Sequence, residues 1–160
     1  MRILGIDPGT GRCGFGVIEV GRGNKTRMVS AGVITTPAHT PLPDRLLDIY
    51  DSLREIIGEC KPDEVAIEKL FFNTNITTGI SVASARGVCL LVARQAELPI
   101  SEYTPLQIKQ SLVGYGRAEK KQVQEMVKIH LGLNAVPKPD DAADGLAAAI
   151  MHAMVKKGRT

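Results

Sequence analysis

Four acidic residues stand where their side chains could be brought together for metal-dependent chemistry. Asp7 and Glu68 each follow a short apolar run, so each is expected at the end of a buried strand. Asp141 and Asp144 are three residues apart at the start of a predicted helix and therefore share one face of its first turn. Carboxylate oxygens from three elements suit a hard cation such as Mg²⁺ or Mn²⁺. Such clusters carry out two-metal phosphoryl chemistry.

Each acid also has a purely structural interpretation. An aspartate at a helix start commonly caps free N–H groups and complements the helix dipole, which is the role assigned to Asp140. Asp7 could cap the Pro-Gly turn that follows it, and Glu68 could pair with a lysine. Taken singly, each acid favours a structural role. Taken together, at element ends and without obvious partners, they favour a metal site.

The first elements that must position these acids are strands. Residues 3–6 form a short apolar strand, and Pro8 and Gly9 force a turn that leaves Asp7 near the surface. Residues 14–20 and 28–34 have the composition of two more strands, joined around 21–25. Three consecutive strands with short connections predict an antiparallel meander.

Helices and strands then alternate along the rest of the chain. A helix is expected from Pro43, with a strand over 63–68, a long helix over about 75–97 and a strand over 100–103. Thr104 and Pro105 indicate a helix start, which Gly114–Gly116 brings to an end. The last two helices are expected over about 118–131 and from 140 to about 155. This order predicts one α/β domain over residues 1–160, with a mixed five-stranded sheet covered by helices.

Composition is that of an ordinary globular protein. The chain has 160 residues, 44% of them hydrophobic, which is enough for one substantial core. Cys13, Cys60 and Cys89 are odd in number and far apart, so they are expected to be reduced thiols in the core. The histidines show no metal-ligand spacing and are assigned structural or surface roles. With no apolar run near 18 residues and no secretory pattern, the expected location is the cytoplasm, away from membranes.

The basic excess lies in the last third of the chain. Residues 1–100 contain 11 basic and 11 acidic residues, whereas residues 101–160 contain 9 basic and 6 acidic ones, which accounts for the net charge of +3. Three of those six acids are the clustered Asp140, Asp141 and Asp144, whose charge a bound cation would partly mask. A basic surface there suits a polyanion, although a solvated surface helix explains the charges equally well.

Five blocks of sequence together make the chain resemble the RuvC family of bacterial Holliday-junction resolvases over its full length. They are Gly5-Ile6-Asp7-Pro8-Gly9-Thr10, Ala66-Ile67-Glu68, Ser84-Ala85-Arg86-Gly87-Val88, Val113-Gly114-Tyr115-Gly116-Arg117-Ala118-Glu119-Lys120 and Asp141-Ala142-Ala143-Asp144. The first block alone is weak, because actin-like ATPases and other ribonuclease H relatives begin similarly. All five in this order are highly specific.

The resemblance implies a ribonuclease H-like fold, with helices on both faces of the sheet, that works as a homodimer. Each subunit would nick one of two like-polarity strands of four-way junction DNA in recombination and repair, leaving a 5′-phosphate and a 3′-hydroxyl. The catalytic, metal-binding acids carry over to Asp7, Glu68, Asp141 and Asp144. Asp7 would bridge two Mg²⁺ ions per subunit, for which Mn²⁺ would be a substitute. The RuvA-RuvB branch-migration complex is the implied partner.

The same resemblance implies further DNA contacts. Phe71 stands where the family has an aromatic residue that wedges between unstacked bases, and Phe72 is assigned to the core. Lys109 and Lys120 match basic residues near the scissile phosphate, where Lys120 would take part in catalysis. Arg117, Lys121 and Lys128 are expected to contact backbone phosphates of the DNA. For each of the three, a side chain that is merely solvated is the alternative.

A strip of small residues, Gly79, Ala83 and Gly87, follows one side of the long helix at four-residue steps. It would let another helix or this chain's own sheet approach closely, and the family's dimer contact uses this region.

Three alternative functions fit parts of the sequence: a nuclease of the same fold acting on RNA–DNA hybrids or ribosomal RNA, an actin-like ATP-binding protein, and a junction-binding module without catalysis. Phe71 and the Lys120 block favour the resolvase, one domain is too little to enclose a nucleotide, and the complete set of acids argues against a non-catalytic module.

Overall fold

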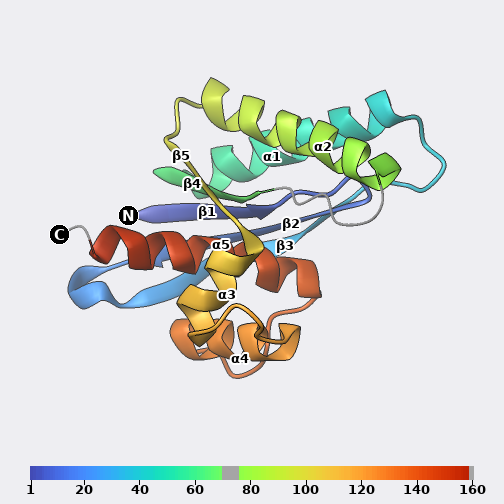
Figure 1. Cartoon of the computed structure of the whole chain (residues 1–160). Coiled ribbons are helices and arrows are strands. Elements are labelled where there is room, and N and C mark those ends of the chain that lie inside the picture. The colour runs from blue at the N-terminus through green and yellow to red at the C-terminus, as the bar shows by residue number, and fades with distance from the viewer. Residues whose placement is uncertain (70–75, 159–160) are drawn as a thin grey trace.

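The computed structural model describes residues 1–69 and 76–158, which contain one five-stranded sheet with helices on both faces (Figure 1). The elements in chain order are β1 (Arg2–Asp7), β2 (Arg12–Val20), β3 (Thr26–Thr35), α1 (Leu42–Cys60), β4 (Glu64–Glu68), α2 (Ile76–Gln95), β5 (Ile100–Tyr103), α3 (Pro105–Val113), α4 (Lys120–Leu131) and α5 (Asp140–Lys157). The predicted α/β architecture with a mixed five-stranded sheet is confirmed.

The strand order is β3-β2-β1-β4-β5, which places β1 at the centre of the sheet. β1, β2 and β3 are antiparallel neighbours, so the predicted meander is confirmed, and a short 3₁₀ turn at Arg22–Asn24 connects β2 to β3. β4 pairs in parallel with β1, and β5 pairs in parallel with β4. β2 and β3 each begin two residues earlier than predicted, because polar residues at their ends also take part in the strand pairing.

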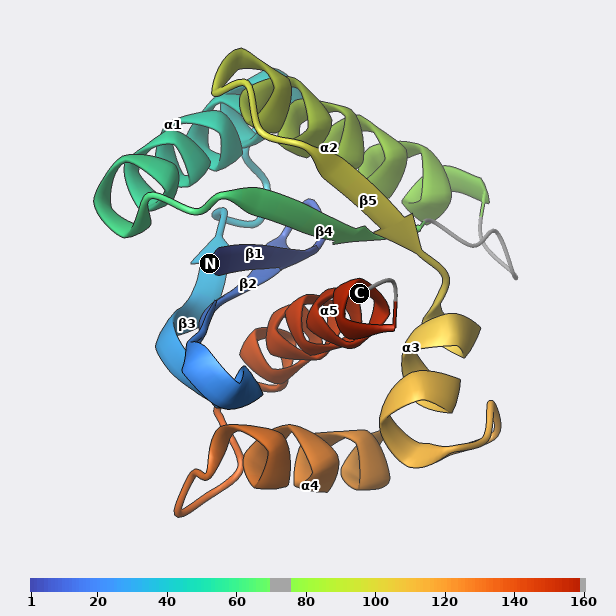
Figure 2. The same ribbon diagram turned by 90° about the vertical axis from the view of Figure 1, so that its left-hand side faces the viewer.

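Helix α5 lies directly against β1 and β2 (Figure 2). A Cβ atom on Gly5 would lie 1.9 Å from the Gly145 carbonyl oxygen, and one on Gly14 would lie 2.0 Å from that of Asp141. Glycine is therefore required where helix and strand backbones meet. Helices α3 and α4 cover the other side of α5, so almost every side chain from Ala142 to Ala153 is buried. This packing fixes the first turn of α5, with its acids, relative to β1.

Helices α1 and α2 pack on the opposite face of the sheet (Figure 2). Their buried side chains, Leu53 and Val92 among them, form a second core with the sheet residues Leu4, Val17 and Ile67. Burial of large apolar side chains on both faces is the main stabilising contribution to this three-layer arrangement.

Helix α2 is strongly apolar. Judged by length and composition alone, it is the one helix among the described residues that is apolar enough to cross a membrane. The sequence reading missed this because Arg86 and Arg94 interrupt the run of apolar residues. The exposed side chains include Ile76, Ile80 and Leu91. This face of α2 is thus apolar and open to solvent.

Local capping signals account for the helix ends near the site. Thr104 Oγ1 accepts a hydrogen bond from Gln107 N at 3.1 Å, and Gly114 ends α3 with φ of 100°, as the sequence predicted. Helix α4 begins at Lys120 rather than near residue 118, because Glu119 N is bonded to Gln122 Oε1 at 2.7 Å and Ala118 turns into the core.

The cysteines and histidines have the structural roles that were expected. Cys13 and Cys89 are buried and Cys60 is half-buried, all three as free thiols. His152 is buried, with Nδ1 2.7 Å from the Tyr103 hydroxyl and Nε2 2.6 Å from Glu64 Oε2. His152 therefore ties α5 to β4 and β5.

Candidate metal centre and nucleic-acid interface

Two of the four acids reach the site from adjacent parallel strands. Ile6 in β1 is paired with Ile67 in β4, so Asp7 and Glu68 follow side by side at the ends of their strands. Their carboxyl groups are close enough for each to affect the pKa of the other. Both acids are at strand ends, as expected, and the parallel pairing brings them to one edge of the sheet.

The other two acids come from the first turn of α5. Asp7, Asp141 and Asp144 each offer a carboxylate oxygen, and these three oxygens lie within 4.8 Å of one another. Asp7 therefore lies between Asp144, within this group, and Glu68 at the end of the neighbouring strand. Glu68 is not in the group of three; it adjoins the group through Asp7.

Asp140 is not a member of this group. Its side chain is 59% exposed, and Oδ2 lies 3.6 Å from Lys120 Nζ. Its place in the first turn of α5 still complements the helix dipole, as predicted, but no side-chain capping bond forms at this end.

The electrostatics of the acids favour a cation. Burial, together with the hydrogen bond and negative charge of Glu68, raises the pKa of Asp7 to about 8. Burial and the charge of Asp7 raise the pKa of Asp144 to about 7. The pKa of Glu68 is also raised, first by burial and then by the charge of Asp144. A divalent cation removes this repulsion, and an all-carboxylate set of donors fits a hard ion.

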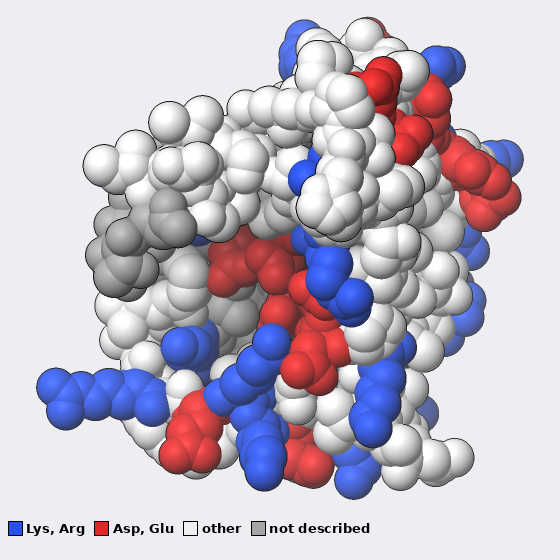
Figure 3. Space-filling model, turned by 90° about the vertical axis from the view of Figure 1, so that its right-hand side faces the viewer, with Lys and Arg blue, Asp and Glu red and all other residues white. Residues whose placement is uncertain are grey.

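A cavity of about 300 Å³ opens over the acids. Figure 3 shows it as a hollow with acidic side chains inside and Lys and Arg side chains around it. Its lining residues are Asp7, Glu68, Pro105, Ile108, Lys109, Lys120, Val123, Asp144 and Ala147. The cavity thus combines cation ligands with groups that attract a phosphate.

Lys120 and Lys109 are the predicted basic residues that line this cavity. Lys120 Nζ lies 3.7 Å from Asp144 Oδ2. Although partial burial acts in the opposite direction, the charges of Asp144 and Asp140 raise the pKa of Lys120. Lys109 lies close enough to Glu68 for its positive charge to oppose the rise in the pKa of Glu68. Both lysines therefore lie beside the acids.

The remaining predicted DNA contacts are less centrally placed. Arg117 and Lys121 are exposed near the start of α4. Lys128 Nζ is 3.7 Å from Glu125 Oε2 within α4, which favours the solvated interpretation for that residue. Phe71 and Phe72 lie outside the described residues, so their predicted roles in base stacking and in the core stay predictions.

Arg12 is a member of the site that sequence reasoning missed. Its Nε donates to Asp141 Oδ2 at 2.8 Å. The available signal was a basic residue five positions after Asp7, directly beyond the turn, but nothing in the sequence relates position 12 to position 141. Arg86 was also passed over as a site residue. It pairs with Glu102 and lines a second cavity of about 210 Å³, together with Asp7, Glu68 and Lys69.

Comparison with known proteins gives one consistent family. Residues 3–152 match the family model described as crossover junction endodeoxyribonuclease RuvC. A protein of that name from Desulfitobacterium hafniense is 57% identical over 153 residues, covering 96% of this chain and 92% of its own length. One from Chloroflexus aurantiacus is 52% identical, with coverage of 96% and 93%.

Solved structures agree with the sequence matches. Thermus thermophilus RuvC superposes with a TM-score of 0.92 at 36% identity, covering 100% of this chain and 98% of that one. The same protein in complex with Holliday junction substrate gives a TM-score of 0.93 at 36% identity, with coverage of 100% and 97%. The yeast mitochondrial Holliday junction resolvase Ydc2 shares the fold, with a TM-score of 0.66 at 14% identity.

Proposed function

This chain belongs to the RuvC family of crossover junction endodeoxyribonucleases, whose fold is ribonuclease H-like, and we propose that it resolves four-way DNA junctions by paired, symmetric nicks. One observation supports this most strongly. In a chain of that family, Asp7, Asp141 and Asp144 bring their oxygens within 4.8 Å of one another beside a cavity that two lysines line. Residues 1–160 are proposed to form a single nuclease domain.

The proposed cofactor is Mg²⁺, two ions per subunit, with Mn²⁺ as a possible substitute. Asp7 is the proposed shared ligand, because it contacts both Asp144 and Glu68. Asp141 and Glu68 would complete the set from either side. When bound, the two ions supply an activated water and stabilisation of the leaving oxygen.

The protein's own cations have a different role in the proposal. Lys120 and Lys109 line the cavity and would bind the oxygens of the scissile phosphate, which places the phosphorus over the acids. Lys120 can hold this position because Asp140 and Asp144, at 3.6 and 3.7 Å, keep its ammonium group charged and oriented. Hydrolysis would leave a 5′-phosphate and a 3′-hydroxyl.

Binding of the junction is proposed to rest on phosphate contacts outside the cavity. Arg117 and Lys121 are exposed next to the cavity residue Lys120 and can reach a DNA backbone. Phe71 is proposed to stack on an opened base at the crossover.

A homodimer is proposed because paired nicks need two active sites. The apolar face of α2 consists of Ile76, Ile80, Ala83, Gly87 and Leu91, all of them exposed in a single chain. A Cβ atom added to Gly87 would meet nothing within 4 Å, so the strip of small residues faces away from this chain's own sheet. A second α2 can approach closely there and cover the apolar side chains. RuvA-RuvB as a partner and a cytoplasmic location remain proposals from family membership.

The proposed function is tested by strand cleavage of a synthetic mobile four-way junction in Mg²⁺. Linear duplex and an RNA–DNA hybrid of matched sequence serve as controls. The proposal expects symmetric nicks on the junction alone. Cleavage of the hybrid instead would retain the acids as a metal site but assign the protein to a different substrate.

A further inference from the structure

Arg12 is a permanent positive charge at the edge of the acid cluster. It begins β2, and its Nε donates to Asp141 Oδ2 at 2.8 Å. The Arg12 side chain is 53% exposed, whereas that of Asp141 is 26% exposed. The guanidinium is thus bonded to the acid on one side and open to solvent on the other.

We propose that Arg12 competes with a divalent cation for Asp141 and transfers to a DNA phosphate when the junction binds. Metal loading is thereby coupled to substrate binding. This inference rests on the proposed function, because it needs both a cation at the acids and a DNA strand over the cavity. It adds to that function a residue which controls when the cation site fills.

Competition follows from charge and from the shared carboxylate. An arginine remains charged at any physiological pH, and one of the two Asp141 oxygens is occupied by its Nε. A divalent cation at Asp7, Asp141 and Asp144 would lie a few ångströms from that charge, where like charges repel. Lys120 contributes a second cation, beside Asp144 and Asp140. A metal ion that binds the acids must therefore either displace the side chains of Arg12 and Lys120 or bind close to their positive charges.

Transfer to DNA follows from the exposure and shape of the guanidinium. Its planar fork fits two oxygens of a phosphate as well as it fits a carboxylate. Basic side chains lie to the right of and below the hollow in Figure 3, so a bound strand would bring phosphates to this side of it. Once Arg12 turns to a phosphate, Asp141 Oδ2 becomes free for the cation. If the cation binds only when the junction is bound, hydrolysis is limited to the DNA strand that lies over the cavity.

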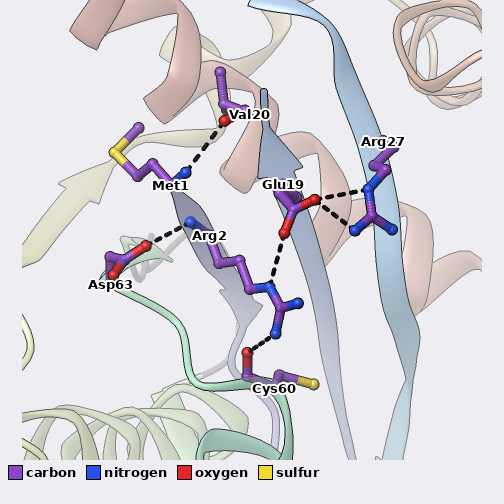
Figure 4. A network of polar contacts seen from close by, with 7 residues as sticks. All are labelled: Met1, Arg2, Glu19, Val20, Arg27, Cys60 and Asp63. Carbon is purple, nitrogen blue, oxygen red and sulfur yellow. Dashed lines mark hydrogen bonds and ion pairs between the residues drawn. The ribbon is translucent and has the colours of Figure 1, made fainter. Parts of the chain in front are cut away.

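The chain offers a matched control for this arginine. Arg27 in β3 pairs with Glu19 Oε2 at 2.5 Å, and its side chain is 63% exposed (Figure 4). Glu19 also pairs with Arg2 at the start of β1, so this pair lies at the opposite end of the sheet from Asp7. Arg27→Gln removes the same charge as Arg12→Gln without touching the acids.

The decisive experiment measures Mn²⁺ affinity without DNA, by paramagnetic resonance of the free ion, for the wild type, Arg12→Gln, Arg27→Gln and Asp7→Asn. We expect Arg12→Gln to bind Mn²⁺ at least about fivefold more tightly, in the range usual for coupled sites, and Arg27→Gln to match the wild type. Unchanged or weaker binding in Arg12→Gln would overturn the competition, since Arg12 would then merely position Asp141. If Asp7→Asn binds Mn²⁺ as the wild type does, the acids are not the metal site and the proposed function itself fails.

The transfer step has its own measurement. Junction affinity is measured at several salt concentrations in Ca²⁺, a hard cation for the same ligands, with intact DNA verified on a denaturing gel. Loss of one phosphate contact in Arg12→Gln should reduce the slope of log affinity against log salt by about 0.9, whereas Arg27→Gln keeps the wild-type slope. An unchanged slope in Arg12→Gln would show that Arg12 does not move to a phosphate.

Discussion

Asp7 and Glu68 lie side by side at the ends of β1 and β4, because these strands are parallel neighbours with Ile6 opposite Ile67. Asp144 reaches the same place from α5, and its carboxylate oxygen lies within 4.8 Å of one of Asp7. Three acids in contact repel one another when charged, and burial increases the cost. Protons and metal ions must therefore compete for the same oxygens.

The first prediction concerns stability and pH. Burial and Glu68 raise the pKa of Asp7 to about 8, and the pKa of Asp144 is raised to about 7, whereas an unfolded aspartate has a pKa of about 3.9. At a pH between the unfolded and the folded pKa values, Asp7 and Asp144 bind more protons in the folded chain than in the unfolded chain. The stability that these two carboxyl groups contribute is therefore fully present below pH 4 and is lost as the pH rises toward 8. In a chelating buffer, the free energy of unfolding by urea should therefore fall from pH 5 to pH 8.

Asp7→Asn tests the origin of that pH dependence. The variant lacks the carboxyl group whose pKa is shifted most. Between pH 5 and pH 8, its free energy of unfolding should therefore fall less than that of the wild type, by more than about 1 kcal/mol. Adding Mg²⁺ should stabilise the wild type at pH 8 and have much less effect at pH 5. The same pH dependence in wild type and variant would show that Asp7 does not titrate between pH 5 and pH 8, which would contradict its raised pKa.

The second prediction separates catalysis from binding at two adjacent lysines. Lys120 lines the cavity, whereas Lys121 is exposed beside it. Lys120→Ala should slow single-turnover cleavage by roughly a hundredfold or more, the usual effect of losing one group that stabilises developing charge. Lys121→Ala should weaken junction binding and leave the cleavage rate of the bound junction unchanged. Equal rate losses in both variants would contradict a special role for Lys120.

The third prediction concerns the apolar face of α2. Ala83 lies on this face, so Ala83→Trp should block the approach of a second α2 and give monomers in sedimentation velocity. Ala135→Trp is a suitable control, because Ala135 is exposed on the other side of the sheet, between α4 and α5. An intact Ala83→Trp dimer would place the interface elsewhere.

The fourth prediction concerns the contact that positions Asp141. A Cβ atom on Gly14 would lie 2.0 Å from the Asp141 carbonyl oxygen, so Gly14→Ala should push α5 away from β2 and cost about 1–3 kcal/mol of stability. It should also weaken Mn²⁺ binding, because Asp141 moves with the helix. At Gly58, on the open side of α1, the same change should stabilise the protein by about 0.5–1 kcal/mol. Gly14→Ala with unchanged stability and metal affinity would contradict this account.

The strand pattern was predictable because it is local. The apolar run before Asp7, the Pro8-Gly9 turn and the capping signal at Thr104 each involve only neighbouring residues, and each leads to the observed element. Strand boundaries were less accurate, because pairing extends β2 and β3 over polar residues that no periodicity marks. The joint site of Asp7, Glu68, Asp141 and Asp144 was favoured by their places at element ends and by the three-residue spacing of the last two, and the family blocks made the assignment specific.

Relationships between distant segments could not be predicted from the residues. The pair of Arg12 with Asp141 depends on the first turn of α5 lying against Gly14, which is a property of the packed structure. Likewise, the sequence did not show that Asp7, Asp141 and Asp144 form the tightest group, with Glu68 adjoining it from the neighbouring strand. The direction of the strip on α2 was open in the sequence, and the structure shows that it faces solvent.

The most direct test of the central claim is a comparison of the wild type with Asp7→Asn on the same mobile four-way junction in Mg²⁺. Nicking and junction affinity are measured in parallel. We predict paired symmetric nicks by the wild type and no detectable nicking by Asp7→Asn. In a chelating buffer, where no divalent cation is coupled to DNA binding, both proteins should bind the junction with the same affinity, because binding rests mainly on phosphate contacts outside the acids. Nicking by Asp7→Asn at the wild-type rate would contradict the assignment of Asp7 and its neighbours as the metal-binding catalytic centre.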